Sequence, residues 1–221
     1  MEPLRLSQAI EENTIELFAW ILLFPVTLID LILSPIAFVD KMSAEMLKAN
    51  ESRFDARMPP VLFLLFGTVP LSIAIAKTSP GSETMPSLTD AALMLALCIA
   101  TFPFVWALST LVARGHRFGR ASFREAFGAQ CYLFCPGWVS VLLIATTSNE
   151  ELLSSNIASL AAFVILLANL IWLLVTEWKL LTRGSSTIKA ALSFAAAITL
   201  SILAGPMLIA LAEATGQKWL S

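Results

Sequence analysis

Long apolar stretches alternate with short polar ones along this chain, and most charges lie at the edges of the apolar stretches. An α-helix rises about 1.5 Å per residue, so about 20 residues cross a hydrocarbon core about 30 Å thick. Because lipid offers the backbone no hydrogen-bonding partner, stretches of this length must form helices that satisfy their own backbone groups. The pattern predicts an all-α polytopic transmembrane bundle with five spans, at residues 59–77, 90–113, 125–147, 155–177 and 187–212.

A further apolar run, residues 17–39, has two interpretations. Its length permits a crossing, but Asp30 lies near its middle with Pro25 and Pro35 on either side. A carboxylate at bilayer depth costs about 2.5–3.5 kcal/mol on insertion scales. We therefore expect residues 15–39 to form an amphipathic or re-entrant helix at the interface, which leaves the N-terminus cytoplasmic and five spans. In the alternative the run crosses, the chain has six spans, and Asp30 becomes a candidate functional residue.

The composition agrees with a membrane location. Of the 221 residues, 57% are hydrophobic and 14% are charged, and the mean hydropathy is +0.80. A soluble domain carries about 25% charged residues. The spans use most of the length, so we expect an N-terminal segment at 1–58 and a bundle at 59–221, with no room for a soluble catalytic domain. The net charge of −2 and the absence of a basic tail argue against a nucleic-acid partner.

Lysine and arginine gather in alternate loops, which predicts the orientation. One set of loops carries Lys41, Lys48, Arg53, Arg57, Arg114, Arg117, Arg120, Arg124, Lys179, Arg183 and Lys189. The opposite set carries only Lys77 and Lys218. The positive-inside rule places the first set in the cytoplasm and the C-terminus on the far side.

One stretch has the character of a family motif. Residues 117–136, RFGRASFREAFGAQCYLFCP, resemble the central pattern of Yip1-domain membrane proteins, with a glycine-containing basic loop, a Ser-Phe-x-Glu-like helix start, and an aromatic and a proline inside the helix. Residues 58–66, MPPVLFLLF, are similar to the first span of that family. The resemblance implies five spans, a cytoplasmic N-terminal region and a C-terminus across the membrane. Eukaryotic members take part in vesicle trafficking, and bacterial relatives are mostly of unknown function or are called permeases. The apolar run at 17–39 departs from the pattern.

Three polar residues inside the apolar stretches are candidates for a role. Asn169 lies near the centre of its span and Gln130 one turn inside another, and we interpret both as interhelical hydrogen-bonding groups. Glu177 lies at the cytoplasmic end of its helix, beside Trp178 and Lys179, where we expect water to reach it. Its functional alternative is an ion pair with an arginine of the loop at residues 114–124.

That loop is the densest cluster of charge in the chain. Arg117, Arg120 and Arg124 follow Arg114 within a few residues, and we expect them to fix the topology and contact anionic lipid at about 1 kcal/mol each. A second interpretation is a phosphate or partner site at the N-terminus of a helix that Ser122 caps.

Small residues recur every four positions in the last span, at Ser193, Ala197, Ser201 and Gly205. Such a stripe lets helix backbones approach closely. It predicts packing against a neighbouring helix of the same chain, or alternatively a face for self-association.

The chemistry-bearing residue types are sparse. Cys98, Cys131 and Cys135 all lie in apolar stretches, where we expect buried thiols, and the single histidine, His116, lies in a loop. We therefore predict no catalytic residues, no metal and no cofactor, and a protein that is not an enzyme.

These observations predict a Yip1-like multi-pass protein of the bacterial inner membrane with a periplasmic C-terminus. Its expected partners are the lipid bilayer and a second copy or another membrane protein. It would act through helix packing and partner or lipid contacts in membrane organisation. The alternative is a permease or channel that forms an oligomeric pore for a small solute.

Overall fold

The computed structural model describes residues 3–47, 57–78, 88–116, 118–147, 155–183 and 185–214. These residues form seven helices and no strand. The helices are α1 (Pro3–Leu33), α2 (Pro35–Leu47), α3 (Pro60–Thr78), α4 (Leu88–Arg114), α5 (Arg120–Thr147), α6 (Ser155–Thr182) and α7 (Thr187–Ala214). The all-α prediction is confirmed over this part of the chain.

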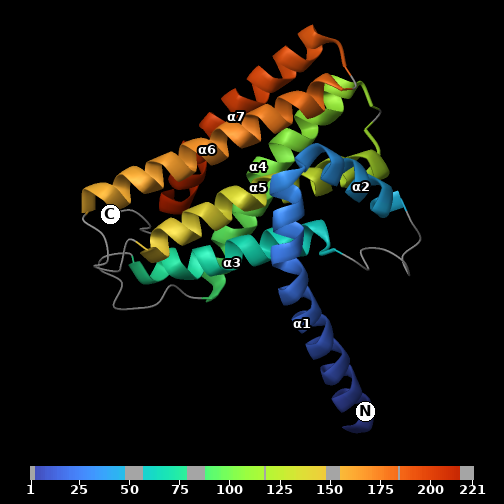
Figure 1. The fold of residues 1–221 in the computed structure, drawn as a ribbon, viewed down its shortest axis with the longest axis vertical. Coiled ribbons are helices and arrows are strands. Elements are labelled where there is room, and N and C mark those ends of the chain that lie inside the picture. Colours follow the sequence, from blue (N-terminus) through green and yellow to red (C-terminus); the bar gives the residue numbers. More distant parts are fainter. Residues whose placement is uncertain are drawn as a thin grey trace.

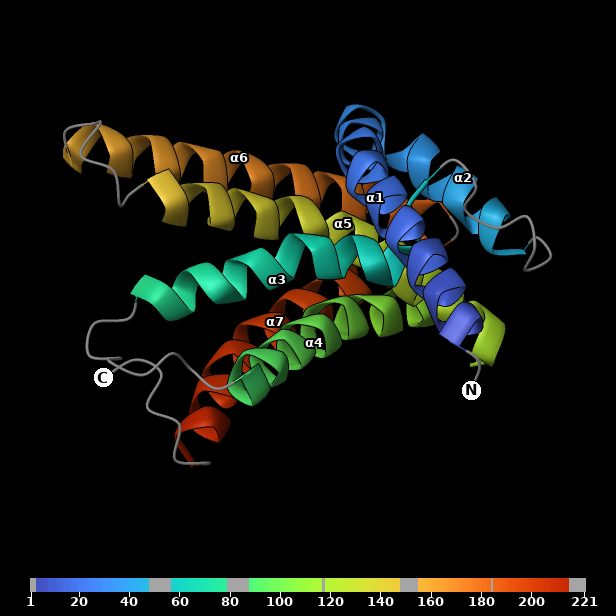
Figure 2. The ribbon, with the colours of Figure 1, turned by 90° about the horizontal axis from the view of Figure 1, so that it is seen from below.

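Helices α3 to α7 correspond to the five predicted spans and pack lengthwise into one bundle (Figures 1 and 2). Helix α5 lies at the centre, because α3, α4, α6 and also α1 and α2 contact it. Helix α7 packs against α4 and α6. All five begin or end within two residues of a predicted limit on at least one side. Helix α5 begins five residues early, at Arg120, because the carbonyl of Gly119 accepts the first helical bond from Phe123 at 2.9 Å.

The N-terminal run forms two helices instead of the single helix predicted over 15–39. Helix α1 ends at Leu33, and α2 begins at Pro35 with a different direction. Proline has no N–H to continue a helix and disfavours the helical conformation at the residue before it, here Ser34. Figures 1 and 2 show α1 crossing the bundle at a steep angle and α2 lying against one end of it.

The largest core joins this N-terminal hairpin, α1–α2, to the bundle. The ring of Tyr132 on α5 stands 4.9 Å from that of Phe38 on α2 and 5.3 Å from that of Phe63 on α3. Phe63 in turn lies 5.0 Å from Phe24 on α1. Aromatic pairs at these centroid distances add stability beyond the area they bury. The hairpin is therefore part of the folded core.

Close backbone approach holds α3 against α5. A Cβ atom built on Gly67 would stand 2.6 Å from the Sγ of Cys135, a separation that real Cβ atoms do not show. The Cys135 thiol also donates to the carbonyl of Phe63 at 3.4 Å. Any larger residue at position 67 would require the Cys135 thiol to move.

Two of the described helices are long and apolar enough to cross a membrane, namely Arg120–Ile144 in α5 and Ser159–Thr182 in α6. In the most apolar 18 residues of each segment, half of the α5 residues are buried in the molecule, but only 6% of the α6 residues are. Large apolar side chains such as Leu160, Phe163 and Leu170 stand more than half exposed on α6. Exposed apolar surface this continuous favours a protein that is associated with a membrane.

Candidate functional site

The basic loops meet at one end of the bundle. The final turns of α4 and α6 and the first turns of α3, α5 and α7 lie at the same end, and α2 packs there (Figures 1 and 2). We call this the basic end. It brings together arginines from loops that are far apart in sequence, and three of them contact the N-terminal hairpin.

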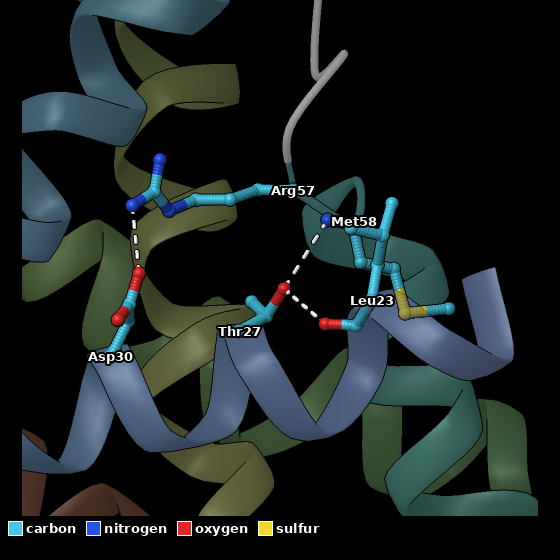
Figure 3. A network of polar contacts seen from close by, with 5 residues as sticks. All are labelled: Leu23, Thr27, Asp30, Arg57 and Met58. Carbon is cyan, nitrogen blue, oxygen red and sulfur yellow. Dashed lines mark hydrogen bonds and ion pairs between the residues drawn. The ribbon is translucent and has the colours of Figure 1, made fainter. Parts of the chain in front are cut away.

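The first contact is an ion pair between α1 and the segment that leads into α3. Arg57 Nη2 lies 2.7 Å from Asp30 Oδ2, and the two side chains are 17% and 43% exposed (Figure 3). The guanidinium also stands 5.8 Å from the centroid of the Phe38 ring. Asp30, a candidate functional residue in the sequence, is thus held in a partly buried, charge-assisted hydrogen bond.

The N–H and the carbonyl of Met58, the residue after Arg57, are both hydrogen-bonded to side chains of other helices. The Met58 N–H donates to Thr27 Oγ1 at 3.4 Å, and that hydroxyl donates to the Leu23 carbonyl at 2.7 Å (Figure 3). The Tyr132 hydroxyl donates to the carbonyl of Met58 at 2.5 Å. Because Met58 precedes α3, these bonds fix the start of that helix against α1 and α5.

Two more arginines hold α2. Arg183, just after α6, places Nη1 2.6 Å from Asp40 Oδ2. Arg124 in α5 donates from Nη2 to the Met46 carbonyl at 3.1 Å. At the C-terminus of a helix, a cationic side chain can donate to a carbonyl that has no partner within the helix. Its positive charge also interacts favourably with the helix dipole. The hairpin is thus anchored by Arg57, Arg124 and Arg183.

A cleft of about 360 Å³ opens between the first turns of α2 and the last turns of α6. Its charged lining residues are Asp40, Lys179 and Arg183. Since Asp40 and Arg183 pair with each other, Lys179 carries the excess charge of the cleft.

Glu177 is buried, and the expectation that water reaches it is wrong. Its side chain is 0% exposed, whereas Trp178 and Lys179 point outward. The α-helical period explains the difference, because Thr176, Glu177 and Leu180 share the face of α6 that meets the bundle. Within the described residues no ion pair joins Glu177 to a basic group.

Gln130 on α5 meets Glu177 and confirms the prediction of an interhelical hydrogen bond. Its Nε2 donates to Glu177 Oε2 at 3.3 Å. Asn169 confirms the same prediction two turns along α6. Its Nδ2 donates to Ser140 Oγ at 2.6 Å and to the Pro136 carbonyl at 3.2 Å, both on α5. The polar residues of α6 thus follow one seam, which we call the α5–α6 seam.

The remaining arginine candidates do not come together in the described structure. Arg120 is exposed in the first turn of α5, and Arg117 lies outside the described residues. The predicted cap at Ser122 is wrong, because α5 begins two residues earlier and Ser122 lies within its first turn. A phosphate site at a Ser122-capped N-terminus therefore has no structural basis.

The small-residue stripe of α7 faces α4 in the same chain. Ser193 and Ala197 are buried, and Ser201 Oγ accepts a hydrogen bond from Trp106 Nε1 at 3.0 Å. This is the intrachain packing that the spacing predicted. Gly205 lies on α7, but its surroundings are outside the described part of the structure.

The described cysteines are buried free thiols, as expected. Cys131 and Cys135 lie in the core, whereas the surroundings of Cys98 are outside the described part. Among the described residues, no group of three His, Cys, Asp or Glu side chains is placed to hold a metal ion.

Several residues of the basic end were missed by sequence reasoning. Arg57 and Arg183 carried only a topology signal in the sequence, and Asp40 carried no signal of its own. Tyr132 carried the best available signal, because it is the only tyrosine and a hydroxyl in an apolar helix requires a partner.

No family model matches this chain, and no curated protein or solved structure is detectably similar to it. The resemblance to Yip1-domain proteins therefore stays a prediction that rests on residues 58–66 and 117–136.

Proposed function

We propose that the chain is an integral membrane protein in which α3 to α7 cross the bilayer and the hairpin α1–α2 closes the cytoplasmic end. The observation that carries this proposal is the outer surface of α6. Most of its large apolar side chains face away from the bundle, and only 6% of its most apolar 18-residue stretch is buried. Hydrocarbon removes the cost that water would impose on this surface, about 25 cal/mol per Å² of exposed apolar area.

Helix α1 fits the interface better than a crossing. It runs at a steep angle to the bundle (Figures 1 and 2). When the bundle crosses the bilayer, α1 is therefore strongly tilted away from the membrane normal. Its outer face is apolar, with Leu22, Val26 and Leu33 exposed, whereas Asp30 turns toward Arg57. This arrangement supports five spans and an interfacial helix.

The orientation follows from the basic end. Positively charged loops stay in the cytoplasm, and the loops of α3 to α7 that carry most of the arginines lie together at one end. The hairpin and the basic end are then cytoplasmic, α7 ends on the far side, and we place the protein in a bacterial inner membrane.

Within that membrane we propose a Yip1-like role in membrane organisation that works through helix packing and contacts with lipid or a partner. Several polar residues of the spans support this role, because they bond to neighbouring helices. Asn169 bonds to Ser140, Tyr132 to the Met58 carbonyl, and Trp106 to Ser201. Such side chains stabilise a bundle without any chemistry of their own.

Labelling of introduced cysteines from one side of the membrane tests the arrangement. We expect a membrane-impermeant maleimide to label Arg120→Cys and Ser186→Cys only from the cytoplasmic face, and Asn149→Cys only from the opposite face. Glu16→Cys should behave like Arg120→Cys. Labelling of Arg120→Cys and Asn149→Cys from the same face would contradict the bundle, and labelling of Glu16→Cys from the far face would establish six spans.

The permease or channel alternative is favoured by one observation, the buried carboxyl of Glu177. Ionisable residues inside a membrane protein often mark a substrate or ion path. Flux into liposomes tests this alternative. Solute entry that Ser201→Trp abolishes and Ser201→Ala retains would establish transport, whereas no flux together with a stoichiometric bound partner would favour the organising role.

A further inference from the structure

The contact between Glu177 and Gln130 is incomplete in its hydrogen bonding. Both side chains are buried, at 0% and 1% exposure. One bond joins them, from Gln130 Nε2 to Glu177 Oε2 at 3.3 Å. The other oxygen of each group, Glu177 Oε1 and Gln130 Oε1, has no hydrogen-bond partner. A buried acceptor without a donor is costly, and two on one pair of side chains require an explanation.

One hydrogen atom on the carboxyl group would supply the missing hydrogen bond of both Glu177 Oε1 and Gln130 Oε1. A carboxylate can only accept, and the amide oxygen can only accept, so the two cannot bond to each other. A protonated carboxyl has one O–H donor, and a carboxylic acid facing an amide forms two hydrogen bonds in a ring. In one bond the amide N–H donates to the acid, and in the other the acid O–H donates to the amide oxygen.

We propose that Glu177 binds a proton and is held as a neutral carboxylic acid paired with Gln130 in the α5–α6 seam. In this pair Oε1 carries the hydrogen and donates to Gln130 Oε1, while the Nε2 bond is retained. The proposal goes beyond the membrane-organising role and does not depend on which side of the membrane the basic end faces. It makes the seam a proton site, and loss of that proton would place an unpaired charge in the core.

The surrounding charges do not supply another partner. From α4, Arg114 is the basic group whose charge reaches Glu177, but the pair does not come within ion-pair distance, and Arg114 Nε is itself without a partner. From α2, Asp40 is engaged by Arg183. On α6 Lys179 is exposed, and on α7 Lys189 is exposed as well. None of these groups forms an ion pair with Glu177.

The substitution Glu177→Gln is the decisive variant. Two amides form the same ring of two hydrogen bonds, so the substitution reproduces the neutral pair and removes the titration. We expect the purified full chain in detergent to lose thermal stability as the pH rises above the ordinary titration range of a carboxyl, where the unfolded chain has released this proton and the folded chain retains it. The expected loss is about 2–4 °C in Tm per pH unit across that range. Glu177→Gln should not show this slope, and Glu16→Gln, at an exposed site on α1, should keep it.

Infrared spectroscopy of the same samples reports the proton directly. The carbonyl stretching band of a buried protonated carboxylic acid should be present in the wild type at pH 7 and absent in Glu177→Gln. If the wild type lacks that band and shares the pH slope of Glu177→Gln, the proposal is wrong. It is equally wrong if sodium chloride, but not choline chloride, stabilises the wild type and this effect disappears in Glu177→Gln, because a bound cation would then bridge the two oxygens.

Discussion

Helices α5 and α6 have similar lengths but different surroundings. Both contain a segment long and apolar enough to cross a membrane, at 25 and 24 residues. In the most apolar 18 residues of each segment, half of the α5 residues are buried by neighbouring helices, whereas only 6% of the α6 residues are. A hydropathy pattern shows that a helix is compatible with an apolar environment, but it does not show whether protein or lipid provides that environment.

The residues of the two helices reflect this difference. Helix α5 places small or polar residues against its neighbours, with Gly128 beneath Met46 and Ser140 against Asn169. Helix α6 is covered with large aliphatic side chains and keeps its polar groups on one narrow seam, at Asn169, Thr176 and Glu177. In a membrane, close packing requires small residues, whereas lipid contact only requires apolar ones.

The comparison is tested most strongly by truncating one leucine on each helix. Leu133 on α5 is 1% exposed and Leu166 on α6 is 41% exposed. We expect Leu133→Ala to lower the free energy of unfolding by about 2–5 kcal/mol, because it leaves a cavity, and Leu166→Ala to change it by about 0.5 kcal/mol or less. Unfolding in mixed micelles measures both, and equal losses would show that α6 is also covered by protein.

A charge on the outer face of α6 should have a comparable effect on insertion. Leu166→Asp should cost about 2.5–3.5 kcal/mol in hydrocarbon and reduce the amount of protein recovered in the membrane fraction. Ile188→Asp, near the start of α7 at the basic end, provides the control and should be recovered normally. Improved solubility of Leu166→Asp without detergent would show that water surrounds α6.

On α5, Tyr132→Phe removes the only described side-chain donor to the Met58 carbonyl. The buried carbonyl then lacks its partner, and we expect a loss of about 1–3 kcal/mol. Thermal unfolding measures it, with Arg120→Ala as an exposed control on the same helix. No change in Tyr132→Phe would mean that the hydroxyl does not fix the start of α3.

Asn169→Leu should lower the free energy of unfolding by less, because it removes only one interhelical polar contact of the α5–α6 seam. Interhelical polar bonds in membranes contribute about 0.6 kcal/mol on average and at most about 1.7 kcal/mol. A double-mutant cycle with Ser140→Ala isolates the bond. A coupling energy near zero would assign the stability of the seam to apolar packing alone.

The smallest effect is expected for Arg183→Ala. Its ion pair with Asp40 is about half exposed on both sides, and exposed pairs contribute about 0–1 kcal/mol. Because salt screens such pairs, the difference from the wild type should shrink as the ionic strength rises. A large, salt-insensitive loss would show that the hairpin depends on this contact.

Hydrophobic patterning predicted the helices well and their partners poorly. The runs at α3 to α7 identify helices because uninterrupted apolar residues need closed backbone bonding. The break between α1 and α2 could be predicted from Pro35. The partner of Asp30 could not be predicted, because Arg57 lies in a polar stretch that the pattern treats as a loop, and Asp30 was therefore interpreted as a candidate functional residue. Contacts between residues that are distant in sequence leave no periodic signal.

Glu177 shows the same limit at closer range. Its neighbours Trp178 and Lys179 are typical of an interface, and one residue along a helix turns the side chain by about 100°. Which of three adjacent residues faces inward depends on where α5 lies. Gln130 and Asn169 were predictable, because an amide inside an apolar helix has few ways to be satisfied.

The three arginines that anchor the hairpin lie at positions 57, 124 and 183. During synthesis the hairpin leaves the ribosome first, and its last anchor appears only after α6 has been made. The hairpin is therefore made well before the last of its three anchors. On the proposed membrane location, insertion has to proceed with this largely apolar hairpin still lacking its last anchor until most of the chain has been made.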